Sequence, residues 1–216
     1  IDYVVLEVSS HALKQYRTYG IPFHTVLITN LTPDHQEYHP TPFDYQATHK
    51  LLITPSLKTL VLNGDDPDTG TLTPTLSPPG RGGEQVLVFH HGNALAKFLE
   101  QEKLPFLAGF NIYNGLAAAT VAESLGVSRD NIKTALQNPG TIPGRLEEIN
   151  EGQPFKIIVD YAHSPVSLKA LFEVITPPSP PLTKGGTKRG STIVVFGACG
   201  ERDPKARPLM GSVLDH

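Results

Sequence analysis

The chain has 216 residues, of which 39% are hydrophobic and 18% charged, and its formal net charge is −3. That length suits one large globular domain or two small ones. The charge lacks the basic excess of nucleic-acid-binding proteins, and no apolar run reaches the roughly 20 residues that span a bilayer. A single cysteine, Cys199, excludes an internal disulfide framework and is typical of a reducing cytoplasm. Both ends fall in element-like runs, so we expect an internal piece of a longer protein.

Apolar, β-branched runs alternate with helical stretches along the chain, which predicts an α/β fold with a mostly parallel sheet. The continuous apolar character of the strand runs favours burial on both faces. The predicted strands are residues 3–8, 25–29, 59–63, 86–89, 156–160 and 192–196. The predicted helices are residues 41–53, 94–101, 111–125, 129–137 and 165–175.

Two segments, 69–85 and 176–190, are rich in Pro, Gly, Ser and Thr and are predicted to be flexible loops. Residues 185–191 of the second segment superficially suggest a phosphate loop. They lack the G-x-x-x-x-G-K-[ST] order, and a Pro-rich lead-in replaces the strand. No other stretch of the sequence supplies such a loop.

Polar side chains follow the first two predicted strands. Glu7 ends the first strand, at the edge where parallel sheets place ligands, although it could instead help Ser9 and Ser10 cap the next helix. Asp34 and His35, with a second histidine downstream, follow the next strand. This combination suits either a divalent cation or charge neutralisation beside a phosphate.

Three further residues have an ordinary interpretation as well as a functional one. Lys50 lies in an amphipathic helical pattern, where a solvated surface lysine is the default. Asn111 opens a helix rich in small residues and could bind a base or cap the helix. Arg145 follows a Pro-Gly turn and could pair with a phosphate or face water.

The last two predicted strands each end in polar or Gly-rich sequence. Asp160 and His163 follow one strand, and a Gly-rich turn with Arg202 follows the next. This pattern is typical of a βαβ nucleotide crevice. The turn is not G-x-G-x-x-G, so a dinucleotide fingerprint is not supported.

The order of these blocks resembles the Mur ligase family, and EVSSHAL resembles its MurE type in particular. The blocks are EVSSHAL, TNLTPDHQEYH, the lysine-bearing helix, LNGDDP, GFNIYNGLAA, PGRLEEI, IVDYAHSPVSLKALF and VVFGACGERDPKARPLMG. The resemblance covers nearly the whole chain except the two Pro/Gly-rich segments.

The resemblance implies part of a central ATPase domain over residues 1–143. The start of a Rossmann-like C-terminal domain, with its first βαβ unit, would follow over residues 144–216, and a hinge would lie near residues 143–145. It implies a cytoplasmic ligase, monomeric when intact, that uses ATP and Mg²⁺. Such a ligase adds meso-diaminopimelate or L-lysine to UDP-N-acetylmuramoyl-L-alanyl-D-glutamate in peptidoglycan synthesis, through an acyl phosphate.

The resemblance also implies roles for individual residues. Glu7 and His35 would be magnesium ligands, and Lys50 would carry a carbamate that helps hold a second magnesium ion; His35 and Lys50 would be the catalytic residues. Contacts to the UDP-N-acetylmuramoyl-dipeptide would come from Ser9, Gln15 and Arg17. Contacts to the nucleotide would come from Asn111, Arg145, Asp160 and His163, and Arg202 would contact the incoming diamino acid.

The sequence departs from the family in three ways. It contains no uridine-binding domain, no phosphate loop before EVSS and no Asp-Asn-Pro-Arg-type motif, which leaves diaminopimelate and lysine undistinguished. We therefore predict that the isolated chain has no ligase activity and, with apolar strand edges exposed, poor solubility. Two alternatives stay open: a non-catalytic remnant or substrate-binding module, or a related ligase such as cyanophycin or folylpolyglutamate synthetase.

Overall fold

The computed structural model describes residues 2–32, 38–75, 85–102, 104, 109–175, 192–197 and 206–214. By its internal contacts the chain divides into two compact units. Unit 1 comprises residues 1–107 and 111–137, and unit 2 comprises residues 108–110 and 138–216.

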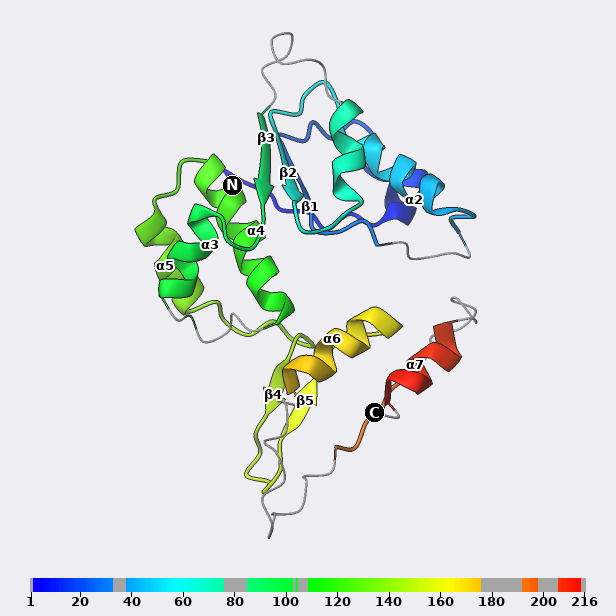
Figure 1. Ribbon diagram of the computed structural model, residues 1–216, viewed down its shortest axis with the longest axis vertical. Coiled ribbons are helices and arrows are strands. Elements are labelled where there is room, and N and C mark those ends of the chain that lie inside the picture. The colour runs from blue at the N-terminus through cyan, green and yellow to red at the C-terminus, as the bar shows by residue number, and fades with distance from the viewer. Residues whose placement is uncertain are drawn as a thin grey trace. The chain divides into compact units, whose positions relative to one another are not determined.

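Unit 1 is built on a parallel sheet with strand order β1-β2-β3 (Figure 1). Its strands are β1 (Thr25–Ile28), β2 (Thr59–Asn63) and β3 (Gln85–Phe89), with Leu60 paired to Val26 on one side and to Val86 on the other. All five residues of β2 are buried, as a central strand covered on both faces requires. The α/β class and the parallel sheet are confirmed, and so are the strands predicted at 25–29, 59–63 and 86–89.

Helices cover both faces of this sheet, with α3, α4 and α5 on one side and α2 on the other (Figure 1). Alternate residues of β2 supply the two cores: Val61 packs among residues of α3, α4 and α5, whereas Leu60 and Leu62 pack with Leu13 of α1. The helical elements are α1 (Ser10–Lys14), α2 (Pro42–His49), η1 (Lys50–Leu52), η2 (Thr69–Thr75), α3 (Ala94–Gln101), α4 (Phe110–Ser124) and α5 (Arg129–Gln137).

Unit 2 begins with an antiparallel pair, β4 (Glu147–Ile149) and β5 (Ile157–Val159), in which Ile149 is opposite Ile157. Two helices follow, α6 (Pro165–Ile175) and α7 (Ala206–Leu214), and they contact each other. The buried apolar side chains described in them are Leu168 in α6 and Met210 in α7.

The strands predicted at 3–8 and 192–196 are wrong for this structure, because neither run is assigned to a strand. Their side chains are largely exposed, reaching 95% at Val5 and 94% at Val195. A β-branched run becomes a strand only when a neighbour supplies hydrogen bonds and a packing surface. No described residue pairs with either run in a sheet.

Other boundaries also differ from the prediction. The helix expected over 41–53 ends at His49, so that Lys50 begins the 3₁₀ helix η1. Part of the loop expected at 69–85 is ordered: residues 69–75 form η2, and Leu72 is fully buried. Composition pointed to a loop, whereas one buried leucine anchors the segment. β4 was not predicted, and α1 and α7 were not among the predicted helix ranges, although a helix capped by Ser9 and Ser10 was considered. Segment 176–190 lies outside the described residues.

Candidate functional site

The carboxyl edge of the parallel sheet holds a hydrogen-bonded polar network. The Asn63 side-chain amide donates to the Thr29 carbonyl (2.9 Å), and its oxygen accepts the Asp65 backbone N–H (3.0 Å). A carboxylate oxygen of Asp66 accepts the Leu31 N–H (3.1 Å). The ends of β1 and β2 are therefore tied together at the edge where parallel sheets bind ligands.

The same network reaches the end of β3 and the start of α4. Asp65 accepts the backbone N–H of His91 at 2.7 Å, and the His91 ring meets the Tyr113 ring edge-on at 4.8 Å between centroids. Burial, followed by the charge and hydrogen bond of Asp65, raises the pKa of Tyr113. In the first turn of α4, Asn111 accepts a hydrogen bond from the Asn114 side-chain amide (3.1 Å). The predicted residue Asn111 thus belongs to the same unit as this edge.

A second polar cluster joins α1 to α2. One carboxylate oxygen of Asp44 lies 2.6 Å from Lys14 Nζ and 2.9 Å from His39 Nδ1. These two hydrogen bonds, Lys14 first, lower the pKa of Asp44. His39 is only 2% exposed, and its Nε2 has no hydrogen-bond partner among the described residues. A carboxylate acceptor makes Nδ1 the donor of this hydrogen bond.

Lys50 lies directly after α2 and is half-buried. The neighbouring His49 is buried, and its Nδ1 donates to the Tyr45 carbonyl at 2.8 Å. Burial lowers the pKa of His49. The preceding helix α2 is capped at its start by Thr41, whose hydroxyl accepts the Asp44 N–H (3.1 Å).

The predicted residues of the EVSSHAL block take different positions. Glu7 is exposed and lies in no strand, while the Ser9 hydroxyl accepts the Ala12 N–H (3.3 Å) as the N-cap of α1. The capping role weighed for Ser9 is therefore confirmed. Gln15 forms the C-cap of α1 through its backbone N–H, and its side chain is exposed like that of Arg17.

In unit 2, three predicted residues gather at the start of β4 and the end of β5. The Arg145 guanidinium carbon lies 4.6 Å from the centre of the Tyr161 ring, and that ring meets His163 edge-on at 4.7 Å. The two oxygens of Asp160 accept backbone N–H groups, of Leu146 at 2.9 Å and of Ala162 at 2.8 Å. Asp160 therefore has a structural role whatever else it binds.

His35 and Arg202 lie outside the described residues. Magnesium prefers oxygen ligands; Glu7 offers a carboxylate, whereas the Lys50 amine would first need carbon dioxide to become an anionic ligand. No group of three His, Cys, Asp or Glu side chains that could hold a metal ion occurs in the described part of the chain. The described residues do not by themselves complete a magnesium site, and the predicted one stays a prediction.

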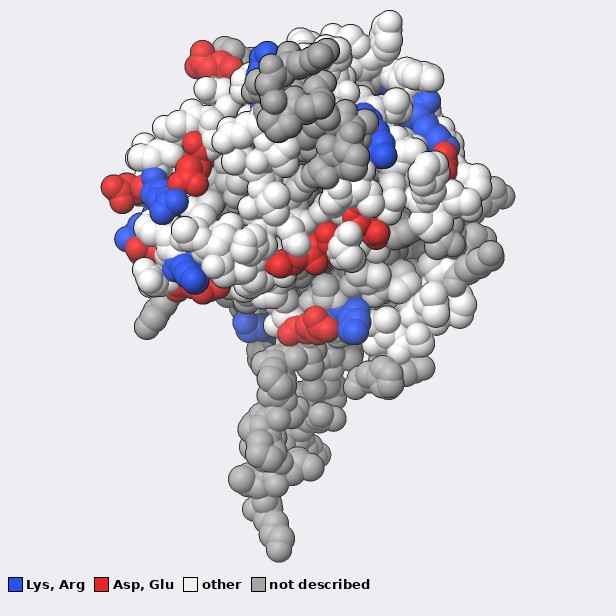
Figure 2. Space-filling model, turned by 45° about the horizontal axis from the view of Figure 1, so that its top comes forward, with Lys and Arg blue, Asp and Glu red and all other residues white. Residues whose placement is uncertain are grey.

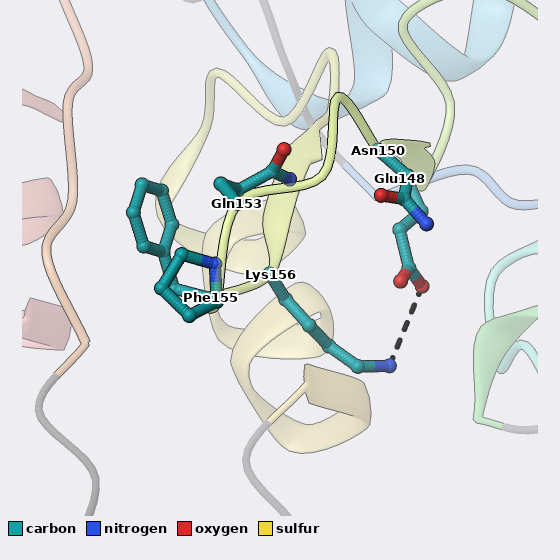
Figure 3. A pocket seen from close by; sticks show the side chains of 6 residues that line it. Glu148, Asn150, Gln153, Phe155 and Lys156 are labelled. Atoms are coloured by element: carbon teal, nitrogen blue, oxygen red, sulfur yellow. Dashed lines mark hydrogen bonds and ion pairs between the residues drawn. The ribbon is translucent and has the colours of Figure 1, made fainter.

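Acidic and basic side chains are interspersed over the face seen in Figure 2. A hollow of about 340 Å³ lies at the β4–β5 connection, where Lys156 Nζ approaches Glu148 Oε2 at 3.3 Å (Figure 3). None of the predicted site residues lines it. Among the described residues, no helix is both long enough and apolar enough to cross a bilayer.

From the sequence, no role was assigned to Asn63, Asp65 or Asp66. His39 was included only as the second histidine of a possible cation or phosphate site, and it was not linked to Lys14 and Asp44 in one cluster. Polar residues directly after the buried β2 run were the available signal for the first group. The cluster joins residues up to 30 positions apart, and no local pattern brings such residues together.

Comparisons of the chain with family models and with curated proteins point to the same family. Residues 1–122 match the model of the Mur ligase middle domain, and residues 144–216 match that of the Mur ligase, glutamate ligase domain. The UDP-N-acetylmuramoyl-L-alanyl-D-glutamate--2,6-diaminopimelate ligases of Geobacillus kaustophilus and Fusobacterium nucleatum are each 35% identical to the chain. Those matches cover 99% and 100% of the chain, and 46% of each relative. The chain thus spans less than half the length of these curated relatives.

Solved structures agree with this assignment. A structure titled UDP-N-acetylmuramoyl-L-alanyl-D-glutamate--2,6-diaminopimelate ligase aligns with a TM-score of 0.62 at 26% identity, over 96% of the chain and 45% of that structure. MurF from Acinetobacter baumannii shares the fold, with a TM-score of 0.56 at 19% identity over 72% of the chain and 38% of that structure. The chain belongs to the Mur ligase family.

Proposed function

We propose that the protein containing this chain forms an amide bond at the expense of ATP, joining a diamino acid to UDP-N-acetylmuramoyl-L-alanyl-D-glutamate through an acyl phosphate. The observation that carries the proposal is the match of both family models in order, together with relatives named as diaminopimelate ligases along nearly the whole chain. Those names favour meso-diaminopimelate over L-lysine.

The residue roles are part of this proposal. Glu7, His35 and carbamylated Lys50 would hold magnesium, which would neutralise charge on the phosphates when bound. Ser9, Gln15 and Arg17 would contact the muramyl dipeptide, and Arg202 the diamino acid. Asn111, Arg145, Asp160 and His163 would contact the nucleotide.

We further propose a domain boundary at residues 143–144, and a cytoplasmic enzyme that is monomeric when intact. The division into compact units after residue 137 and the family match beginning at residue 144 support a boundary in this region.

The test uses the full-length protein with ATP, Mg²⁺, UDP-N-acetylmuramoyl-L-alanyl-D-glutamate and either meso-diaminopimelate or L-lysine. We expect phosphate release and a product of the mass of the tripeptide, with diaminopimelate preferred. Phosphate release without tripeptide, or no turnover with either amino acid, contradicts the proposal.

Lys50 provides the sharpest variant. Lys50→Arg keeps the positive charge but cannot carry a carbamate, so we expect a loss of about 100-fold or more in kcat, the range for removing a transition-state charge stabiliser. Lys58→Ala, at an exposed lysine eight residues away, is the matched control and should retain activity. Carbon-13-labelled bicarbonate should give a carbamate NMR signal in the parent protein that Lys50→Arg lacks.

The isolated 216 residues contain no phosphate loop, so we expect no ATP turnover from them whether the protein is a ligase or a substrate-binding module. The full-length protein is therefore needed to separate these two alternatives. Tight binding of UDP-N-acetylmuramoyl-L-alanyl-D-glutamate by a full-length protein that does not turn over ATP would favour the module.

A further inference from the structure

The turn before β4 has an uncommon backbone conformation. Gly144 and Leu146 both adopt positive φ, 70° and 47°, and Arg145 lies between them. Leucine rarely adopts this left-handed conformation, because its Cβ crowds the backbone. A residue held this way signals that surrounding contacts determine the local shape.

Two carboxylates supply those contacts. The Gly144 N–H donates to Glu147 Oε2 at 2.8 Å, and the Leu146 N–H donates to Asp160 Oδ2 at 2.9 Å. Asp160 follows β5, so the second bond ties the turn to the adjacent strand. The backbone on both sides of Arg145 is thereby fixed, and its side chain starts from a defined point.

The Arg145 side chain then lies over the Tyr161 ring, with its guanidinium carbon 4.6 Å from the ring centre. This is a cation–π geometry. Arg145 forms no ion pair with a carboxylate among the described residues. Stacking occupies the face of a guanidinium and leaves the N–H donors at its edge available.

The Tyr161 ring also contacts the ring of His163. His163 meets it edge-on at 4.7 Å, and His163 Nδ1 donates to the Tyr161 carbonyl at 2.8 Å. Because a carbonyl can only accept, the Nδ1 proton is fixed, and Nε2 carries any further hydrogen bond of this ring. Tyr161 therefore contacts both Arg145 and His163, shortly before α6 begins at Pro165.

We propose that Tyr161 is a positioning residue. Its ring face holds the Arg145 guanidinium, and the bond from Leu146 to Asp160 sets the turn, so that the guanidinium edge can bind a phosphate group of the nucleotide. Planar, bidentate pairing with phosphate is the chemistry for which a pre-oriented guanidinium is suited. This inference rests on the proposed function, because it takes the nucleotide as the ligand.

The test compares Tyr161→Ala with Tyr161→Phe in the full-length ligase. Phenylalanine keeps the ring face, so Tyr161→Phe should stay within about twofold of the parent enzyme in kcat/KM for ATP, whereas Tyr161→Ala should lose about three- to tenfold. Phe155→Ala removes another exposed aromatic ring of unit 2 and serves as the matched control. Equal losses in Tyr161→Phe and Tyr161→Ala would overturn the proposal, because they would implicate the hydroxyl rather than the ring face.

A double-mutant cycle separates positioning from a general structural effect. In an Arg145→Ala background, Tyr161→Ala should cost little more, because its effect acts through the missing guanidinium. Additive losses would contradict the proposal.

A readout independent of activity distinguishes failure of this inference from failure of the proposed function. In protein labelled at arginine, ring currents should shift the Arg145 side-chain NMR signals in the parent and in Tyr161→Phe, but not in Tyr161→Ala. If the shift is present and ATP is not turned over, the proposed function fails while the stacking survives. If the shift is absent, the positioning role is wrong.

Discussion

Asn63 is the side chain whose loss should most directly loosen the carboxyl edge of the sheet. It lies at the end of β2, is almost fully buried, and is bonded both to the Thr29 carbonyl after β1 and to the Asp65 N–H. Asn63→Ala removes one donor and one acceptor without adding bulk. The matched control is Asn30→Ala, at an exposed asparagine whose side chain makes a long 3.4 Å hydrogen bond to Thr29.

The size of the effect follows from the two bonds. A hydrogen bond contributes about 0.5–1.5 kcal/mol net, and a buried group left unpaired costs about 1–3 kcal/mol. The Thr29 carbonyl and the Asp65 N–H belong to exposed residues, so water can replace the lost partner. Only the net contributions of the two bonds then count, and we expect Asn63→Ala to destabilise the edge by about 1–3 kcal/mol. Asn30→Ala should stay within about 0.5 kcal/mol, as surface substitutions usually do.

Amide hydrogen exchange measures this locally in the full-length protein. Protection of the β1 and β2 amides should fall by about 5- to 150-fold in Asn63→Ala, the equivalent of that free energy. Protection of unit 2 amides serves as an internal reference. A change of less than about threefold at β1 and β2, or an equal change in Asn30→Ala, would refute the argument that Asn63 ties the strand ends together.

Three further outcomes can be checked by the same exchange measurement. Leu72→Ala should cost about 2–5 kcal/mol, because Leu72 is fully buried, whereas little change would show that residues 69–75 pack weakly. Asn93→Ala should cost about 1 kcal/mol and Asn93→Gly only a few tenths, because the Asn93 side chain caps α3 by accepting the Ala96 N–H at 2.7 Å; equal costs would contradict capping. Burial lowers the pKa of His49, so its contribution to stability is complete above the ordinary histidine pKa of about 6.5 and is lost as the pH falls through the lowered folded-state value. Protection of α2 should therefore fall more between pH 7 and 5 in the parent than in His49→Gln, and equal slopes would exclude His49 as the cause.

The sequence correctly predicted elements that are either completely buried or specified by local signals such as a helix cap. β2 reads as an unbroken apolar run, and all of its residues are buried in the centre of the sheet. The predicted range of α3 matches the structure because Asn93 provides a cap and an apolar face follows it. The prediction of a loop at 69–85 was wrong for residues 69–75. Composition is averaged over the whole segment, so it gives little weight to the single buried residue Leu72.

The candidate site was harder to predict from the sequence, because its contacts join residues that are far apart along the chain. Asp66 bonds Leu31 across 35 residues, and Asp44 bonds Lys14 across 30. The role of Ser9 is hard to predict for a different reason. Its hydroxyl can either cap a helix or contact a substrate, and the local sequence does not distinguish the two roles. Roles that the family resemblance implied for single residues therefore remain predictions to be tested by substitution.

How firmly the backbone of each predicted site residue is fixed depends on the structural element in which that residue lies. Lys50 follows a helix with a capped start, and Arg145 lies in a turn fixed by two carboxylates. Glu7 lies in an exposed apolar run without a sheet partner among the described residues, so no ladder of hydrogen bonds sets the direction of its carboxylate. A metal site needs its ligands within a few tenths of an ångström of their ideal positions. Pairing of residues 3–8 with a neighbouring strand would therefore be a precondition for Glu7 to bind magnesium, and substitutions that weaken such pairing should lower magnesium affinity without touching a ligand.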